Sequence, residues 1–317
     1  MLTPAVLRPV DAVDFPVEVR RQDAFTALGE LPPESVHLIC TSPPYWGHRL
    51  YEQDALENLL QTWAAETSDP SQQPGYEWYR RNGGSLGLEP LPEWYVEHVA
   101  EILSCGHGAL RSDGSLWVNM GDTYFARWAS IRAEGRQGLA GAQRTRRRTP
   151  SGGWRHDKQL LMLPARFAIA MQERGWILRN DVIWAKPHVG PRPERDRLRL
   201  SHEHFFHFVR RQKGGRPKYW YDLAAAEVGG MDVVVQHVSR DSHGHPATFP
   251  KELVRPRVLS SCPLGGLVVD PFCGAGTTLQ VAIETGRRAL GFDVSQAYVN
   301  VTRQRLGLEL PGRHSLR

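Results

Sequence analysis

Two short apolar runs near the C-terminal end of the chain each end in an aspartate and lead into a stretch with helical spacing. The first run, 266–269, ends at Asp270, and the second run, 289–292, ends at Asp293. A glycine-rich turn follows the first run, and a glycine closes the helical stretch after it. The expected helices cover residues 277–286 and 296–306. This order of strand, helix, strand and helix predicts a parallel sheet flanked by helices.

Similar periodicity elsewhere in the chain adds five strands and three helices. The expected strands are 17–20, 35–40, 115–119, 176–184 and 204–210. The expected helices are 25–31, 94–110 and 159–174. Together with the two C-terminal strands they predict an α/β fold, a doubly wound and mostly parallel sheet of seven strands.

Long segments with weak periodicity interrupt this pattern. Loops of such length are uncommon in compact domains unless they have a function. We therefore expect residues 1–317 to form a single domain that carries inserted segments, which are candidates for contact with a partner. These segments are 47–92, 124–158 and 187–244.

Composition narrows the class of protein. The chain has 317 residues, of which 41% are hydrophobic and 23% charged, enough to bury a full core. It has neither an apolar stretch long enough for a membrane span nor the pattern of a signal peptide, so we expect a cytoplasmic protein without membrane contact. The cysteines are far apart and form no CxxC pair, which predicts neither a metal site nor disulfides. They are Cys40, Cys105, Cys262 and Cys273.

The net charge of +5 is unevenly distributed along the chain. Residues 127–158 hold eight Arg and one Lys against two acidic residues, and residues 186–218 hold ten basic residues against three acidic ones. Each segment therefore has a charge of +7, and the rest of the chain has a charge of −9. Two basic segments on an acidic body are typical of binding to a phosphate backbone, although either segment alone could be a solvated surface.

The turn after the run 266–269 has the properties of a cofactor loop. Gly274 and Gly276 lack a Cβ, so the backbone can turn sharply, and the helix that follows offers free N–H groups to a carboxylate. The third glycine of a dinucleotide fingerprint is replaced by Leu279, which argues against NAD or FAD. Asp293, at the end of the next strand, is placed to accept hydrogen bonds from ribose hydroxyls. A glycine-rich turn alone is also compatible with a purely structural role.

The hexapeptide TSPPYW at 41–46 is a more specific signal. Its two prolines remove backbone donors and fix φ, so their carbonyls are rigid acceptors suited to a substrate that donates hydrogen bonds. An exocyclic amine held by the Ser42 hydroxyl and the Pro43 carbonyl could direct its lone pair at a methyl group. The ring of Tyr45, after Pro44, offers a face on which an extrahelical base can stack. A proline-rich turn with buried aromatic residues would have the same sequence.

With both motifs present, most of the chain resembles the amino-methylating DNA methyltransferases of bacterial restriction-modification systems. DPFCGAGTT resembles their cofactor loop, GFDVS their ribose-binding strand end and TSPPYW their catalytic loop. Further similar stretches are RQDAFTALGELPPESVHLI, LRNDVIWAKP, SHEHFFHFVRR and HPATFPKELV. The catalytic loop precedes the cofactor loop, as in the permuted beta group. In that family Asp or Asn before Pro-Pro usually accompanies adenine N6 and Ser usually accompanies cytosine N4, so Ser42 favours cytosine N4.

The resemblance implies a circularly permuted, Rossmann-like fold with S-adenosyl-L-methionine as cofactor and double-stranded DNA as substrate. It also implies a possible partner restriction endonuclease and a monomeric or homodimeric state. Asp270, Phe272, Gly274, Gly276 and Thr277 would surround the methionine part, Asp293 would bind the ribose, Asp23 would approach the adenine amino group, and Thr248 and Phe249 would close the pocket. From the basic segments we expect DNA contacts by Arg144, Arg146, Arg147, Arg148, Arg192, Arg195 and Arg197.

Other functions remain open from the sequence. An adenine N6 enzyme would share the fold, and related Pro-Pro-Tyr loops occur in RNA and protein-glutamine methyltransferases. A DNA-binding module without activity is a further alternative, although a complete cofactor loop argues against it. Cytosine C5 methylation needs a nucleophilic cysteine, usually in a Pro-Cys step, and the chain has only the reversed pair Cys262-Pro263.

Overall fold

A computed structural model describes residues 16–47, 70–126, 128–132, 144–149, 151–187, 195–212, 214–226, 231–237 and 249–308. The strands are β1 (Val17–Arg21), β2 (Val36–Thr41), β3 (Leu110–Met120), β4 (Trp128–Arg132), β5 (Arg144–Arg148), β6 (Trp176–Ala185), β7 (His202–Arg210), β8 (Val233–Val235), β9 (Leu267–Asp270) and β10 (Arg288–Asp293). The helices are α1 (Ala24–Glu30), α3 (Tyr76–Arg81), α4 (Pro92–Cys105), α5 (Leu163–Glu173), α6 (Lys251–Ser261), α7 (Thr277–Glu284) and α8 (Gln296–Arg305), with a short 3₁₀ turn, η1 (Pro70–Gln72).

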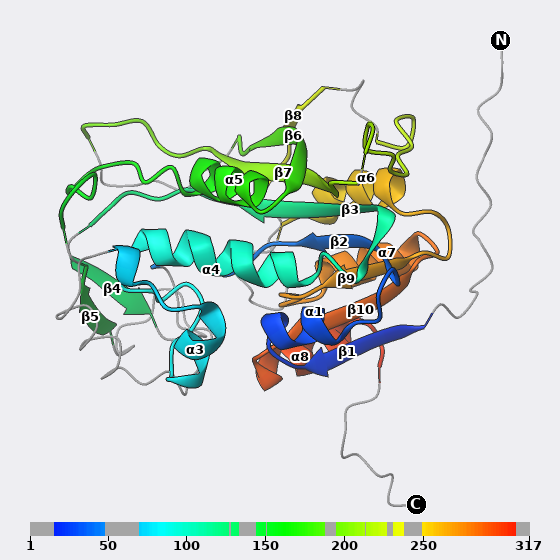
Figure 1. Ribbon diagram of the computed structural model, residues 1–317, viewed down its shortest axis with the longest axis horizontal. Coiled ribbons are helices and arrows are strands. Elements are labelled where there is room, and N and C mark those ends of the chain that lie inside the picture. Colours follow the sequence, from blue (N-terminus) through cyan, green and yellow to red (C-terminus); the bar gives the residue numbers. More distant parts are fainter. Residues whose placement is uncertain are drawn as a thin grey trace, which may run out of the picture.

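One sheet forms the centre of the fold, and in the described residues it has eight strands in the order β1-β10-β9-β2-β3-β7-β6-β8. Figure 1 shows it from β1 at the bottom to β6 and β8 at the top. β7 runs antiparallel to both of its neighbours, and the other pairings are parallel. β2 and β9 are adjacent strands. After β2 the chain continues to β3 on one side of this pair, and after β9 it continues to β10 on the other side. Such a switch point opens a crevice at the carboxyl ends of the strands.

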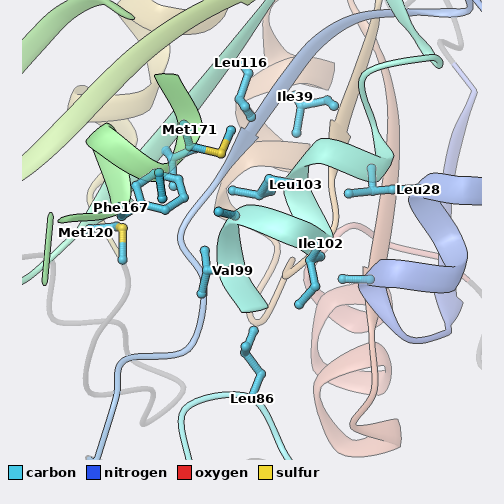
Figure 2. Close-up of a cluster of buried hydrophobic side chains, with 14 of the residues drawn as sticks. Leu28, Ile39, Leu86, Val99, Ile102, Leu103, Leu116, Met120, Phe167 and Met171 are labelled. Atoms are coloured by element: carbon cyan, nitrogen blue, oxygen red, sulfur yellow. The ribbon is translucent and has the colours of Figure 1, made fainter. Parts of the chain in front are cut away.

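Helices cover both faces of the sheet, as a doubly wound fold requires. α1, α4 and α5 pack on one face, and α6, α7 and α8 on the other. Figure 2 shows the first core, in which Val99, Ile102 and Leu103 of α4 lie among side chains of α1, β2 and α5. These three α4 residues recur at helical spacing and are almost completely buried. The same core includes Leu86, from the segment just before α4.

The predicted α/β class and the mostly parallel sheet are confirmed, but the predicted count of seven strands is wrong. The additional strand, β8, has three residues and is too short to show alternation in the sequence. α6 was not expected either, because Pro256 lies inside it and breaks the usual helical signal. The helix expected at 94–110 ends at Cys105, and the chain turns through Gly106 into β3.

The segments expected as insertions have different structures. Residues 187–244 include β7, which pairs with β3 and β6 in the main sheet, so this segment is not an insertion throughout. Within 124–158, β4 and β5 form a separate antiparallel hairpin. Within 47–92, α3 packs on α4. No helix in the described part of the chain has the length and apolar character needed to cross a membrane.

Candidate active site

A pocket lies at the switch point, where the carboxyl ends of β2, β9 and β10 meet. It brings together residues from both motifs of the sequence, although the motifs are more than two hundred positions apart. The lining residues are Asp23, Ala24, Ser42, Pro43, Pro44, Tyr45, Tyr76, Ser85, Leu86, Phe249, Asp270, Pro271, Phe272, Cys273, Gly274, Ala275, Thr277, Asp293, Val294 and Tyr298.

The glycine turn after β9 is shaped by backbone conformations that other residues rarely adopt. Gly274 and Gly276 have φ values of +49° and +79°. A Cβ on Gly276 would lie 2.6 Å from Cγ2 of Thr302 in α8, so this glycine allows the turn to pack closely on that helix. Gly276 is the N-cap of α7 and does not line the pocket, whereas Gly274 does. The first turn of α7 has no side-chain cap, so its N–H groups are suited to an anionic ligand group.

Asp293 holds this turn from the neighbouring strand. Its carboxylate accepts hydrogen bonds from the amides of Gly274 (3.0 Å) and Ser295 (2.8 Å). A carboxylate has four acceptor positions, which makes Asp293 a group suited to hydroxyl donors of a ligand.

Asp270 connects the turn after β9 to the strand that carries the second motif. Its Oδ1 accepts hydrogen bonds from the Thr41 hydroxyl (2.5 Å) and from the Phe272 amide (3.1 Å). Burial raises the pKa of the Asp270 carboxyl to about 6. The carboxylate is therefore ionised at neutral pH, in a position that favours a cationic ligand group.

Asp23 forms another wall of the pocket and also caps α1. Its Oδ1 accepts from the amides of Phe25 (3.0 Å) and Thr26 (3.4 Å), and its Oδ2 accepts from the Tyr76 hydroxyl (2.9 Å). Tyr76 belongs to α3, so part of the expected insertion 47–92 contributes to the pocket. Sequence reasoning missed Tyr76, Ser85, Leu86 and Tyr298, because no motif marks these positions.

The Pro-Pro loop after β2 is fixed by hydrogen bonds to neighbouring segments. The Tyr95 hydroxyl donates to the Pro44 carbonyl (2.8 Å), and the indole of Trp46 donates to the Glu89 carbonyl (3.0 Å). The Ser42 hydroxyl and the Pro43 carbonyl have no such partner within the described segments. Two acceptors on a rigid loop therefore remain available at the pocket.

Tyr45 points into a polar cluster that the sequence did not reveal. Its hydroxyl donates to Oε2 of Glu203 (2.8 Å), which also accepts from Nδ2 of Asn119 (2.8 Å). Lys186 forms an ion pair with Oε1 of Glu203. Side chains alternate between the two faces of a strand, and this alternation could have indicated the cluster. Asn119 lies on the same strand face as the buried Trp117, and Glu203 lies on the same face as the buried Phe205.

The structure describes only some of the remaining residues that were expected at the site or on the DNA-binding surface. Thr248 and Arg192 lie outside the described residues. Arg144, Arg146, Arg147 and Arg148 belong to β5, of which only the backbone is described. Arg195 is exposed, and the Arg197 guanidinium lies 3.6 Å from the ring centroid of Tyr124. Phe249 lines the pocket, where it was expected.

The cysteines of the chain are free thiols. Cys273 lines the pocket, and burial raises the pKa of its thiol well above the usual value, so the thiolate is not populated near neutral pH. No group of metal-ligating side chains occurs in the part of the chain that the structure describes.

The pocket fits S-adenosylmethionine chemically. Carboxylates at Asp23, Asp270 and Asp293 suit the cationic and hydrogen-bond-donating parts of that molecule, and the start of α7 suits its carboxylate. Apolar walls at Leu86 and Phe249 suit its adenine ring.

Comparison with known proteins agrees with this geometry. Residues 36–304 match the model of the N6/N4 methyltransferase family, described as DNA methylase. Type II methyltransferase M.Cfr9I of Citrobacter freundii is 34% identical over 292 residues, which cover 90% of this chain and 85% of the relative. Type II methyltransferase M.XycI of Xanthomonas campestris pv. cyanopsidis is 32% identical over 309 residues, 95% of this chain and 91% of the relative.

Solved structures share the fold at lower identity. The PvuII DNA methyltransferase (cytosine-N4-specific) aligns with a TM-score of 0.63 and 20% identity over 95% of this chain and 88% of that one. A putative DNA modification methylase of Thermus thermophilus, in complex with S-adenosyl-L-methionine, aligns with a TM-score of 0.53 and 21% identity over 94% and 97% of the two chains. The chain therefore belongs to the N6/N4 DNA methylase family, and it is an S-adenosylmethionine-dependent DNA amino-methyltransferase of the restriction-modification type.

Proposed function

We propose that this protein methylates the N4 amine of cytosine in double-stranded DNA, within a specific recognition sequence. The observation that carries the proposal is a pair of acceptors at the edge of the cofactor pocket, the Ser42 hydroxyl and the Pro43 carbonyl, which have no partner among the described residues. The choice of cytosine is supported by the serine at position 42 and by the fold shared with the PvuII enzyme, which is specific for cytosine N4.

Each residue proposed to hold the cofactor would bind a different chemical group of it. Thr277 and the free amides at the start of α7 would bind its carboxylate, and Asp270 would face its cationic part. Asp293 would accept hydrogen bonds from the ribose hydroxyls, and Asp23 from the adenine amino group. When bound, S-adenosylmethionine supplies an electrophilic methyl group on a sulfonium.

The loop Ser42–Tyr45 would prepare the amine for transfer. With one amine proton on the Ser42 hydroxyl and the other on the Pro43 carbonyl, the nitrogen lone pair is drawn out of conjugation with the ring. The rigid loop thereby contributes orientation, which is a large part of the acceleration in such reactions. Because the pKa of the amine collapses once it is methylated, its extra proton passes to water, and no strong base is needed.

The base would have to leave the DNA duplex to reach this loop. Unstacking costs a few kcal/mol, and stacking on the ring of Tyr45 would offset part of that cost. We propose that the basic segments 127–158 and 186–218 bind the phosphate backbone and base edges nearby, through Arg195 and Arg197 among others.

Analysis of nucleosides tests the proposal directly. DNA amplified in vitro, which carries no methyl groups, is incubated with the protein and S-adenosylmethionine, digested to nucleosides and analysed by mass spectrometry. We expect N4-methylcytosine. N6-methyladenine in its place would refute the cytosine assignment while leaving the family assignment intact, and Ser42→Ala should form no methylated nucleoside while still binding the cofactor.

A further inference from the structure

The cluster around Glu203 places four polar side chains from separate segments at the carboxyl edge of the sheet. Tyr45 belongs to the catalytic loop, Asn119 to β3, Glu203 to β7, and Lys186 directly follows β6. Both oxygens of the Glu203 carboxylate are used, Oε2 by Tyr45 and Asn119 and Oε1 by Lys186. Nδ2 of Asn119 also lies 3.1 Å from the Tyr45 hydroxyl, which closes the cluster.

This cluster is largely removed from water. The exposed fractions of the Glu203 and Lys186 side chains are 11% and 16%, and Asn119 is 1% exposed. A carboxylate in such surroundings must be paired and hydrogen-bonded, because a buried charge without partners is very costly. Lys186 supplies the opposite charge, so the hydrogen bond from the Tyr45 hydroxyl to Glu203 is a charge-assisted one.

The surroundings also restrict the Tyr45 ring. A Cβ on Gly121 would lie 3.3 Å from Cε2 of Tyr45 and 3.3 Å from Oε1 of Glu203, so this glycine lets both side chains pack closely against the backbone. On the preceding side, the Tyr95 hydroxyl fixes the Pro44 carbonyl. The ring is therefore held at its hydroxyl end and at its backbone, while Tyr45 still lines the pocket.

We propose that Glu203 is a positioning residue, which fixes the Tyr45 ring in its stacking orientation before the target base arrives, and that Lys186 and Asn119 hold Glu203 in place. This inference rests on the proposed function, in which the base stacks on Tyr45. A ring ordered in advance loses less conformational entropy when the base binds, so more of the stacking energy is available to offset unstacking of the DNA.

A double-mutant cycle tests the inference. Tyr45→Phe keeps the ring but removes the hydroxyl, and Glu203→Gln keeps the shape but removes the charge. A hydrogen bond to a charged group contributes about 1.5 kcal/mol or more, so each variant should lower kcat about tenfold on unmethylated DNA. Because both changes remove the same charge-assisted hydrogen bond, the double variant should also lose about tenfold, with the Kd for S-adenosylmethionine changed less than about twofold.

Two outcomes would overturn the inference. One is a double variant that loses the product of the two single effects, about a hundredfold, because the residues would then act independently. The other is full kcat in Tyr45→Phe. Glu284→Gln is the matched control, since it weakens ion pairs to Lys251 and Arg255 between α6 and α7, away from the pocket. It should retain kcat, and thermal unfolding of all variants identifies any general loss of stability.

The inference and the proposed function can fail separately. A wild-type protein that methylates no DNA would refute the proposed function and the inference with it. A wild-type protein that forms N4-methylcytosine, combined with independent effects at Tyr45 and Glu203, would refute the inference alone.

Discussion

Asp270 has to be an anion for its proposed contact with a cationic cofactor, yet it is buried. Burial raises its pKa from 3.8 to about 6, against the hydrogen bonds from Thr41 and Phe272. A raised pKa in the folded protein means that ionisation of Asp270 costs stability as the pH rises from about 4 through 6. The cost is about 3 kcal/mol at 1.36 kcal/mol per pH unit, which suits a residue kept for ligand binding rather than for stability.

Cofactor affinity should therefore depend on pH through Asp270. At pH 5 only about one tenth of this carboxyl is ionised, so we expect S-adenosylmethionine to bind about tenfold more weakly at pH 5 than at pH 7.5. Calorimetric titration over this range measures the effect. Asp270→Asn should bind weakly at both pH values, and an equally steep pH dependence in that variant would assign the titration to another group.

At the scale of single elements, one histidine of α4 binds the segments on both sides of α3, which contributes to the pocket. Nδ1 of His98 lies 3.2 Å from Oε1 of Glu89, and Nε2 lies 3.0 Å from the Pro74 carbonyl. Both partners are acceptors, so both ring nitrogens carry a proton and His98 is a cation. Burial alone would lower the pKa of His98, but the hydrogen bond to Glu89 raises it above its usual value.

His98→Gln would leave the Glu89 carboxylate buried without a cation. Breaking a buried pair in this way costs about 3 kcal/mol, so we expect that loss in the free energy of unfolding, measured by chemical denaturation. Because a raised pKa stabilises the fold below the unfolded value of 6.5 and this stabilisation disappears above the folded one, the difference from wild type should shrink at alkaline pH. His107→Gln, at a partly buried histidine packed on Trp176, is the control and should cost less.

The sequence predicted the strands that carry the two motifs, but not the distant side chains that complete the site. Strands β2, β9 and β10 have apolar runs that end in polar residues, and the sequence indicated both the strands and the functional loops after them. Tyr76 and the Glu203 cluster could not be predicted in the same way. Their partners lie between 17 and 158 positions away, and only the order of strands brings them together.

At the scale of the whole molecule, the strand order explains why the functional loops are so far apart in sequence. Thr41 and Asp270 form a hydrogen bond across a separation of 229 residues, because β2 and β9 are parallel neighbours at the switch point. The segments between them supply α4, the basic hairpin of β4 and β5, and the strands of the Glu203 cluster. This intervening stretch thus contributes part of the carboxyl edge of the sheet and also contains both basic segments.

The basic hairpin of β4 and β5 and the cofactor pocket belong to different parts of the chain, so we expect DNA binding and cofactor binding to respond differently to salt. Changing Arg144, Arg146, Arg147 and Arg148 together to Gln removes four charges from the segment 127–158, which has a net charge of +7. Removing one phosphate contact should lower the slope of log K against log salt by about 0.9, so we expect the slope for DNA to fall by about 3.6 when four contacts are removed. The Kd for S-adenosylmethionine should not change, because the described lining of its pocket comes from other segments of the chain. Fluorescence anisotropy with labelled duplex DNA between about 50 and 200 mM salt measures the slope. An unchanged slope would place the DNA-binding surface on the other basic segment, 186–218.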